Sequence, residues 1–128
     1  MAPQLDALGI VSQDIGRSLT FYALLGVNVP ETPDAEDHVE AVLPSGLRLM
    51  WDSVELIQQI SPSWEAPVGH RMAMAFLCES PAKVDQVFAE VVAAGFVGAK
   101  EPWDAFWGQR YAQLQDPDGN LVDLFATL

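Results

Sequence analysis

One pattern of elements occurs twice in this chain, and this repetition constrains the fold more than any other feature. A short apolar stretch at residues 5–11 precedes a helix that Asp14 can cap, and a second stretch at residues 72–78 precedes a helix that Ser80 can cap. The two copies are offset by roughly 65 residues, which is too few copies for a solenoid and suits a pseudo-twofold pair of units.

Each unit is predicted to contain one strand, one helix and three further strands. In the first unit the later strands are expected at residues 27–29, 38–43 and 47–52. In the second unit a loop at 101–108 separates the helix from clear strands at 110–115 and 120–125. The expected fold class is therefore α+β, with two tandem βαβββ units at about residues 4–53 and 70–128 of a single domain spanning 1–128.

Two connecting segments are also predicted from composition. An acidic, proline-containing loop is expected at residues 30–37. The segment 53–69 joins the units, and residues 54–60 within it have the pattern of a short helix.

Charge and length restrict the classes of partner. The 128 residues are 50% hydrophobic and carry a net charge of −12, which disfavours nucleic acid and anionic membrane surfaces. No apolar run approaches the roughly 20 residues that span a bilayer. The single cysteine cannot form an internal disulfide and no secretory leader is recognisable, so we expect a cytoplasmic protein. A small molecule or another protein remains as the partner.

The first strand of each unit alternates between bulky and small side chains. The bulky set, expected to lie under the helices, is Leu8, Ile10, Met72, Met74 and Phe76. The small set on the other face is Ala7, Gly9, Ala73 and Ala75. Small side chains in the centre of a sheet leave space for a ligand. Alternatively, they allow close packing of another strand or subunit.

The hairpin strands carry polar side chains on the same face as the small residues. The helix-facing set is Val39, Ala41, Leu43, Ala112 and Leu114. The opposite set is His38, Glu40, Arg48, Met50 and Asp52 in the first unit and Tyr111, Gln113, Gln115, Leu121, Asp123 and Phe125 in the second. This set has the composition of a binding face, although one face of an antiparallel sheet is often simply solvated.

Three tracts give the chain a family resemblance. Residues 10–26 look like the opening strand and helix of the glyoxalase/bleomycin resistance protein/dioxygenase superfamily, whose fold is called vicinal oxygen chelate. Residues 107–111 resemble a tract of its bleomycin-resistance-like branch, and 116–124 resemble its closing hairpin. The resemblance implies paired βαβββ units that form a cupped mixed sheet, and usually a homodimer.

Metal-using members of this superfamily place ligands on the first and last strands of each unit. By the resemblance, these positions fall on Ala7, Met50, Ala73 and Asp123. Only Asp123 offers a hard donor, so we expect no metal site and no cofactor. The alternative is a rearranged site formed by His38, Glu40 and Asp123.

Large aromatic residues in the segment 101–108 need an explanation. Trp103, Phe106 and Trp107 are expected to form a lid over the binding face or to contact a partner subunit of a homodimer. The alternative is burial in the core of the same chain.

The preferred interpretation is metal-independent binding of a small organic molecule with cationic or aromatic groups. The predicted ligand-binding residues are His38, Glu40, Arg48, Met50, Trp103, Trp107, Tyr111, Gln113, Asp123 and Phe125. The alternative is a metal-independent isomerase or lyase in which Asp123 is the acid or base and Tyr111 or Arg48 stabilises developing charge. A metal-dependent glyoxalase or dioxygenase-type enzyme with a rearranged site and a protein-interaction module are the other two hypotheses.

Overall fold

The computed structural model describes residues 2–31 and 36–128. The chain forms two compact units, Met1–Pro67 and Val68–Leu128, which are described in turn. In the described part of the chain, every helix is too short or too polar to cross a membrane.

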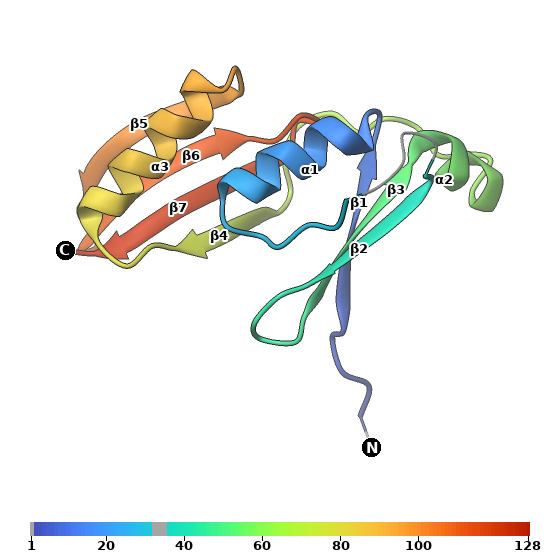
Figure 1. The fold of residues 1–128 in the computed structure, drawn as a ribbon, viewed down its shortest axis with the longest axis horizontal. Helices are drawn as coiled ribbons and strands as arrows, with labels where there is room; N and C mark the ends of the chain where they lie inside the picture. The colour runs from blue at the N-terminus through green and yellow to red at the C-terminus, as the bar shows by residue number, and fades with distance from the viewer. Residues whose placement is uncertain (1, 32–35) are drawn as a thin grey trace. The chain divides into compact units, whose positions relative to one another are not determined.

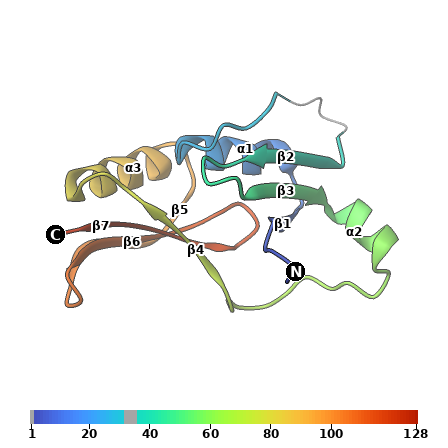
Figure 2. The same ribbon diagram turned by 90° about the horizontal axis from the view of Figure 1, so that it is seen from below.

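The described part of the first unit is a three-stranded mixed sheet with two helices (Figures 1 and 2). Its elements are β1 (Ala7–Ser12), α1 (Ile15–Leu24), β2 (His38–Val42), β3 (Arg48–Ser53) and α2 (Val54–Ile60). The strand order is β1-β3-β2, with β1 parallel and β2 antiparallel to the central β3. The short helix expected at residues 54–60 is confirmed.

Local chemistry explains where α1 begins and ends. The Asp14 carboxylate accepts a hydrogen bond from the Arg17 backbone N–H at 3.1 Å, as an N-cap residue does. After the helix, Gly26 adopts φ of 89°, a conformation that a side chain disfavours. Tyr22 of α1 lies edge-on to Trp51 of β3, with ring centroids 5.6 Å apart, and both side chains are fully buried. This aromatic pair joins the helix to the sheet.

The strand predicted at residues 27–29 is wrong. The Val27 N–H donates to the Tyr22 carbonyl at 3.1 Å, and the Val29 N–H donates to the Val27 carbonyl at 3.0 Å. These local bonds, with the Val27 side chain buried, turn the chain at the end of α1 instead of leaving it free to pair in the sheet. The first unit is therefore βαββ. Of the acidic loop predicted at 30–37, residues 32–35 lie outside the described residues.

The second unit has the predicted βαβββ order. Its elements are β4 (Ala73–Leu77), α3 (Pro81–Ala93), β5 (Val97–Ala105), β6 (Gln109–Gln115) and β7 (Leu121–Thr127). The sheet order is β4-β7-β6-β5, with β4 parallel to β7 and the other neighbours antiparallel. Helix α3 lies along one face of this sheet (Figure 1). The α+β fold class is thus confirmed.

The core of this unit lies between α3 and the sheet. The buried side chains are Val84, Val87 and Val91 from the helix and Ala112, Leu114, Val122 and Leu124 from the strands. Because strand side chains alternate between faces, the intervening residues of β6 and β7 lie on the face away from α3. That face carries the second unit's predicted ligand-binding residues.

Two further details differ from the sequence-based expectations. Trp103 lies within β5 and pairs with Tyr111 of β6, so the predicted loop at 101–108 is reduced to a short turn after Ala105. The predicted burial of Met72 under a helix is also wrong, because Met72 precedes β4 and is 76% exposed. At residues 101–105, pairing with β6 gives a strand where a loop was predicted.

The closing motif at residues 116–120 is a structural turn. The buried Asp116 carboxylate accepts bonds from the backbone N–H groups of Asp118 and Asn120, at 2.9 and 2.8 Å, and from the Asn120 side chain at 2.8 Å. All of these bonds are made within the turn, so Asp116 serves to align β6 with β7.

Gly98 of β5 lies close against Phe88 and Val92 of α3, and this generates a prediction. A Cβ at Gly98 would lie 2.6 Å from the Phe88 ring, whereas one at Gly9 would meet only Met50 at 3.8 Å. We expect Gly98→Ala to destabilise the fold by about 1–3 kcal/mol from overpacking, partly offset by about 0.4–1 kcal/mol of unfolded-state entropy. Urea unfolding measures the change. Gly9→Ala is the matched control and should be neutral or stabilising; equal losses in both variants would contradict this account.

Candidate functional site

The predicted site residues are divided between the two units. The first unit holds a chain of charged side chains around His38, and the second holds a carboxylate, Asp123, among aromatic rings. We call the first the His38 network, formed by Asp6, His38, Glu40, Arg48 and Asp52. We call the second the β5–β7 face, formed by Lys100, Trp103, Trp107, Tyr111, Gln113, Asp123 and Phe125.

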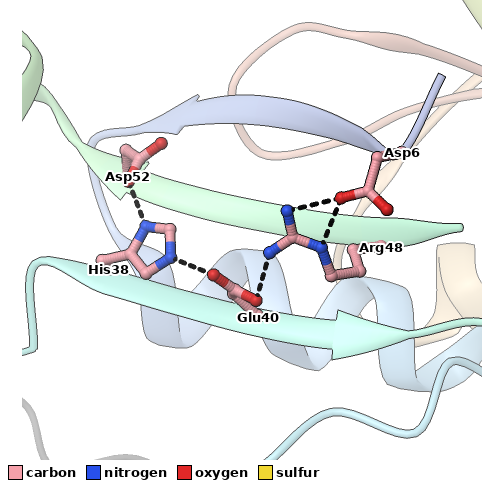
Figure 3. Close-up of polar contacts among 5 residues, drawn as sticks. All are labelled: Asp6, His38, Glu40, Arg48 and Asp52. Atoms are coloured by element: carbon pink, nitrogen blue, oxygen red, sulfur yellow. Dashed lines mark hydrogen bonds and ion pairs between the residues drawn. The ribbon is translucent and has the colours of Figure 1, made fainter. Parts of the chain in front are cut away.

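The His38 network runs across β2 and β3 as alternating charges (Figure 3). The His38 Nδ1 lies 2.5 Å from Asp52 Oδ1, and its Nε2 lies 2.7 Å from Glu40 Oε2. Glu40 also accepts from Arg48 Nη1 at 2.6 Å. Arg48 in turn donates to Asp6 Oδ2 from Nε and Nη2, at 3.0 and 2.7 Å. The register that places His38 opposite Asp52 makes this chain continuous.

The electrostatics of the network favour the charged forms of His38, Glu40 and Arg48, and the bonds to Glu40 and Asp6 raise the pKa of Arg48. Hydrogen bonds to Asp52 and then Glu40 raise the pKa of His38. Hydrogen bonds from His38 and then Arg48 lower the pKa of Glu40. When His38 is protonated, both imidazole nitrogens donate to carboxylates. In this arrangement His38 has no free nitrogen to serve as a base or a metal ligand.

Asp123 is the central polar group of the β5–β7 face. It is only 6% exposed, and its Oδ2 accepts a hydrogen bond from the Tyr111 hydroxyl at 2.5 Å. The Gln113 side chain donates to Oδ1 over 3.4 Å, a long contact. Burial, and next the bond to Asp123, raise the pKa of Tyr111 to about 12. The phenol therefore stays protonated at neutral pH and donates to the carboxylate.

Aromatic rings from two strands and one turn gather around Tyr111 of β6, the residue that contacts Asp123. Trp103 of β5 and Trp107 of the following turn both lie edge-on to Tyr111, at centroid distances of 5.5 and 5.4 Å. On the other side Tyr111 stacks on Phe125 of β7 at 6.3 Å. The strand register, which pairs Tyr111 with both Trp103 and Phe125, creates this row. Phe106, in the same turn as Trp107, is 96% exposed.

Two residues of these groups were missed by sequence reasoning. Asp6 lies 42 positions from Arg48 in the chain, and only the pairing of β1 with β3 brings the two together. Lys100 lies in the segment predicted as leading into a loop, and its ammonium group sits 3.9 Å from the centroid of the Trp103 ring. Its pairing with Gln113 could have been proposed only if β5 had been recognised as a strand.

The positions implied as metal ligands by the family pattern do not fit a divalent ion. Ala7 and Ala73 have no donor atom, Met50 offers a thioether, and Asp123 is the one hard donor. Across residues 2–31 and 36–128, no cluster of three or more His, Cys, Asp or Glu side chains is arranged to hold a metal.

Comparison with known proteins establishes the family. The family model of the glyoxalase/bleomycin resistance protein/dioxygenase superfamily matches residues 4–124. The chain belongs to this superfamily. No curated protein matches it in sequence.

Solved structures share the superfamily fold. A glyoxalase-related enzyme from Fulvimarina pelagi is 19% identical with a TM-score of 0.84, over 98% of this chain and 89% of that one. A glyoxalase/bleomycin resistance protein/dioxygenase from Nocardioides is 24% identical with a TM-score of 0.76, over 100% and 85%. A family enzyme from Burkholderia phytofirmans is 21% identical with a TM-score of 0.80, over 98% and 100%. At these identities the likeness shows the fold alone.

The His38 network predicts a pH dependence of stability. Because the folded-state pKa of His38 is raised, its stabilisation is complete below the ordinary value of about 6.5 and is lost as the pH rises through the raised value. Urea unfolding of the wild type and of His38→Gln should differ most at low pH, by at most about 1 kcal/mol because the side chain is 41% exposed. Any contribution of the other histidine, His70, is the same in both proteins and drops out of the difference in unfolding free energy. A difference that does not change with pH would contradict the account.

The contact between Tyr111 and Asp123 predicts a second titration. Asp123→Asn should lower the pKa of Tyr111 from about 12 toward its ordinary value, with burial still holding part of the increase. The near-ultraviolet absorbance of tyrosinate measures this, and Tyr111→Phe assigns which of the 2 tyrosines titrates. In the wild type, the stabilisation from this raised pKa is lost between about pH 10 and about pH 12. An unshifted Tyr111 in Asp123→Asn, with circular dichroism showing a folded protein, would contradict the contact.

Proposed function

We propose that this superfamily member binds, without a metal, a small organic molecule that carries a cationic group and aromatic character, on its β5–β7 face. The observation that carries the proposal is the buried Asp123 carboxylate. Among the described residues its hydrogen-bond partners are a phenol and an amide, both neutral. A buried carboxylate is costly unless its charge is compensated, so this one favours a cation supplied from outside the chain.

The surrounding rings support the same ligand chemistry. A cation near Asp123 would also be attracted by the electron-rich faces of Tyr111 and Phe125. A flat ring attached to that cation could stack on or pack edge-on against the same side chains. The −12 net charge of the chain adds long-range attraction for a cationic molecule.

The His38 network supports a structural role instead. Its basic groups, His38 and Arg48, are each hydrogen-bonded to two carboxylates, so their positive charges are compensated within the chain. A ligand would have to break these bonds to use either cation. For this reason we place the ligand on the β5–β7 face rather than on the face of the first unit.

A second candidate is a metal-independent isomerase or lyase. The observation in its favour is the 2.5 Å contact between the Tyr111 hydroxyl and Asp123, a phenol and a carboxylate that could act together in proton transfer. In this arrangement Asp123 would be the base and Tyr111 the donor to a developing oxyanion. Turnover of a bound carbonyl compound that is abolished in both Asp123→Asn and Tyr111→Phe would favour this candidate over binding alone.

The binding proposal is tested with a simple aromatic amine. We expect 2-phenylethylamine to bind the wild type, and Asp123→Asn to weaken that binding by roughly 1.5–3 kcal/mol, the range for a hydrogen bond to a charged group. This is about 10- to 150-fold in Kd, measured by isothermal titration calorimetry.

The matched control is Glu79→Gln, which removes one exposed carboxylate outside the β5–β7 face. It should leave the affinity unchanged, and thermal melts should show that both variants are folded. Equal affinity in the wild type and Asp123→Asn would overturn the proposed role of this carboxylate.

A further inference from the structure

Lys100 differs from Arg48 and Arg110 in the groups that its charged end contacts. Arg48 and Arg110 each contact two carboxylates. Lys100 forms no ion pair with a carboxylate in the described part of the chain, although Asp and Glu outnumber Lys and Arg by 18 to 6. Its ammonium instead lies over the Trp103 ring, 3.9 Å from the centroid. A solvent-exposed lysine in this position keeps its charge available to an incoming anion.

Strand register places Lys100 and Asp123 in one row. Lys100 of β5 pairs with Gln113 of β6, and Gln113 pairs with Asp123 of β7. Neighbouring strands lie about 4.8 Å apart, so the backbones of Lys100 and Asp123 are separated by roughly 10 Å. The next row along the strands is Trp103, Tyr111 and Phe125. The face thus has a positive end, a negative end and an aromatic row beside both.

This arrangement restricts how a cationic ligand can lie. The Lys100 ammonium repels a second cation from the Trp103 ring, while Asp123 attracts it at the other end of the row. The amine of a ligand is therefore directed to the Asp123 end. A group that contacts Lys100 at the same time must be an acceptor, and a carboxylate makes the strongest such contact.

From this placement we infer that Lys100 is a specificity-determining residue and that the ligand is a two-ended aromatic molecule, with an amine that binds Asp123 and a carboxylate that binds Lys100. The inference rests on the proposed function, because Asp123 must hold the amine. It adds the second charged end and the residue that recognises it. The separation of roughly 10 Å between the backbones of Lys100 and Asp123 suits a ring with its two charged groups at opposite positions. In an α-amino acid the two charges are too close together to reach both residues.

Two probes that differ in a single group test the inference. The probes are 4-(2-aminoethyl)benzoate, which has both ends, and 2-phenylethylamine, which lacks the carboxylate. We expect the wild type to bind the two-ended probe roughly 10-fold more tightly, as one added charge-assisted hydrogen bond predicts. Lys100→Met keeps most of the apolar stem over Trp103 and should abolish this preference, because only the two-ended probe loses a contact to the ammonium group.

Lys83→Met is the matched control. It removes one lysine from α3, which covers the opposite face of the sheet, and should preserve the preference for the two-ended probe. If the wild type binds both probes equally, or if Lys100→Met weakens both to the same extent, the role of Lys100 is overturned while the binding of the amine stands. If neither probe binds, or if Asp123→Asn leaves both affinities unchanged, the proposed function fails, and the inference fails with it.

Discussion

The antiparallel pairing of β6 and β7 under α3 is the constraint on which the second unit depends. The buried residues Ala112, Leu114, Val122 and Leu124 must face the helix, and a shift of one residue would turn them all toward solvent. The same alternation leaves Tyr111 beside Phe125 and Gln113 beside Asp123 on the other face. Core packing and the composition of the β5–β7 face are therefore two results of one register.

The two units show different ways of keeping charge in a folded chain. In the first, the two basic side chains, His38 and Arg48, each contact two of three carboxylates between Asp6 and Asp52, and exposed ion pairs of this kind contribute little to stability individually. In the second, Asp123 is buried with neutral donors, and Lys100 lies over a ring on a strand two positions away. A ligand can contact charged side chains that have no ion-pair partner without first breaking an existing ion pair. It cannot do so in the His38 network, where the cations are already paired.

Family membership shows the fold of this chain, whereas its chemistry depends on the side chains that it carries. The capped helices and the closing turn around Asp116 keep the superfamily fold, and their side chains bond within their own segments. The positions that the family resemblance implies as metal ligands are Ala7, Met50, Ala73 and Asp123, of which three have no hard donor atom. A shared fold therefore does not transfer the chemistry, which has to be argued from the side chains present.

The sequence alone determined the local elements, because caps and periodicity act within a few residues. Asp14 and Ser80 each accept a bond from the backbone three residues on, and their helices begin where these side chains predict. The face that carries Tyr111, Gln113 and Asp123 also followed from alternation in strands that were recognised correctly.

Tertiary structure decided what local signals could not. Residues 27–29 have strand composition but turn at the end of α1, and residues around Trp103 resemble a loop but pair with β6. The contacts of Arg48 with Asp6 and of Lys100 with Trp103 depend on which strands become neighbours and on the irregular register of β5. Such pairings are set by the packing of distant segments, and no short stretch of sequence contains that information.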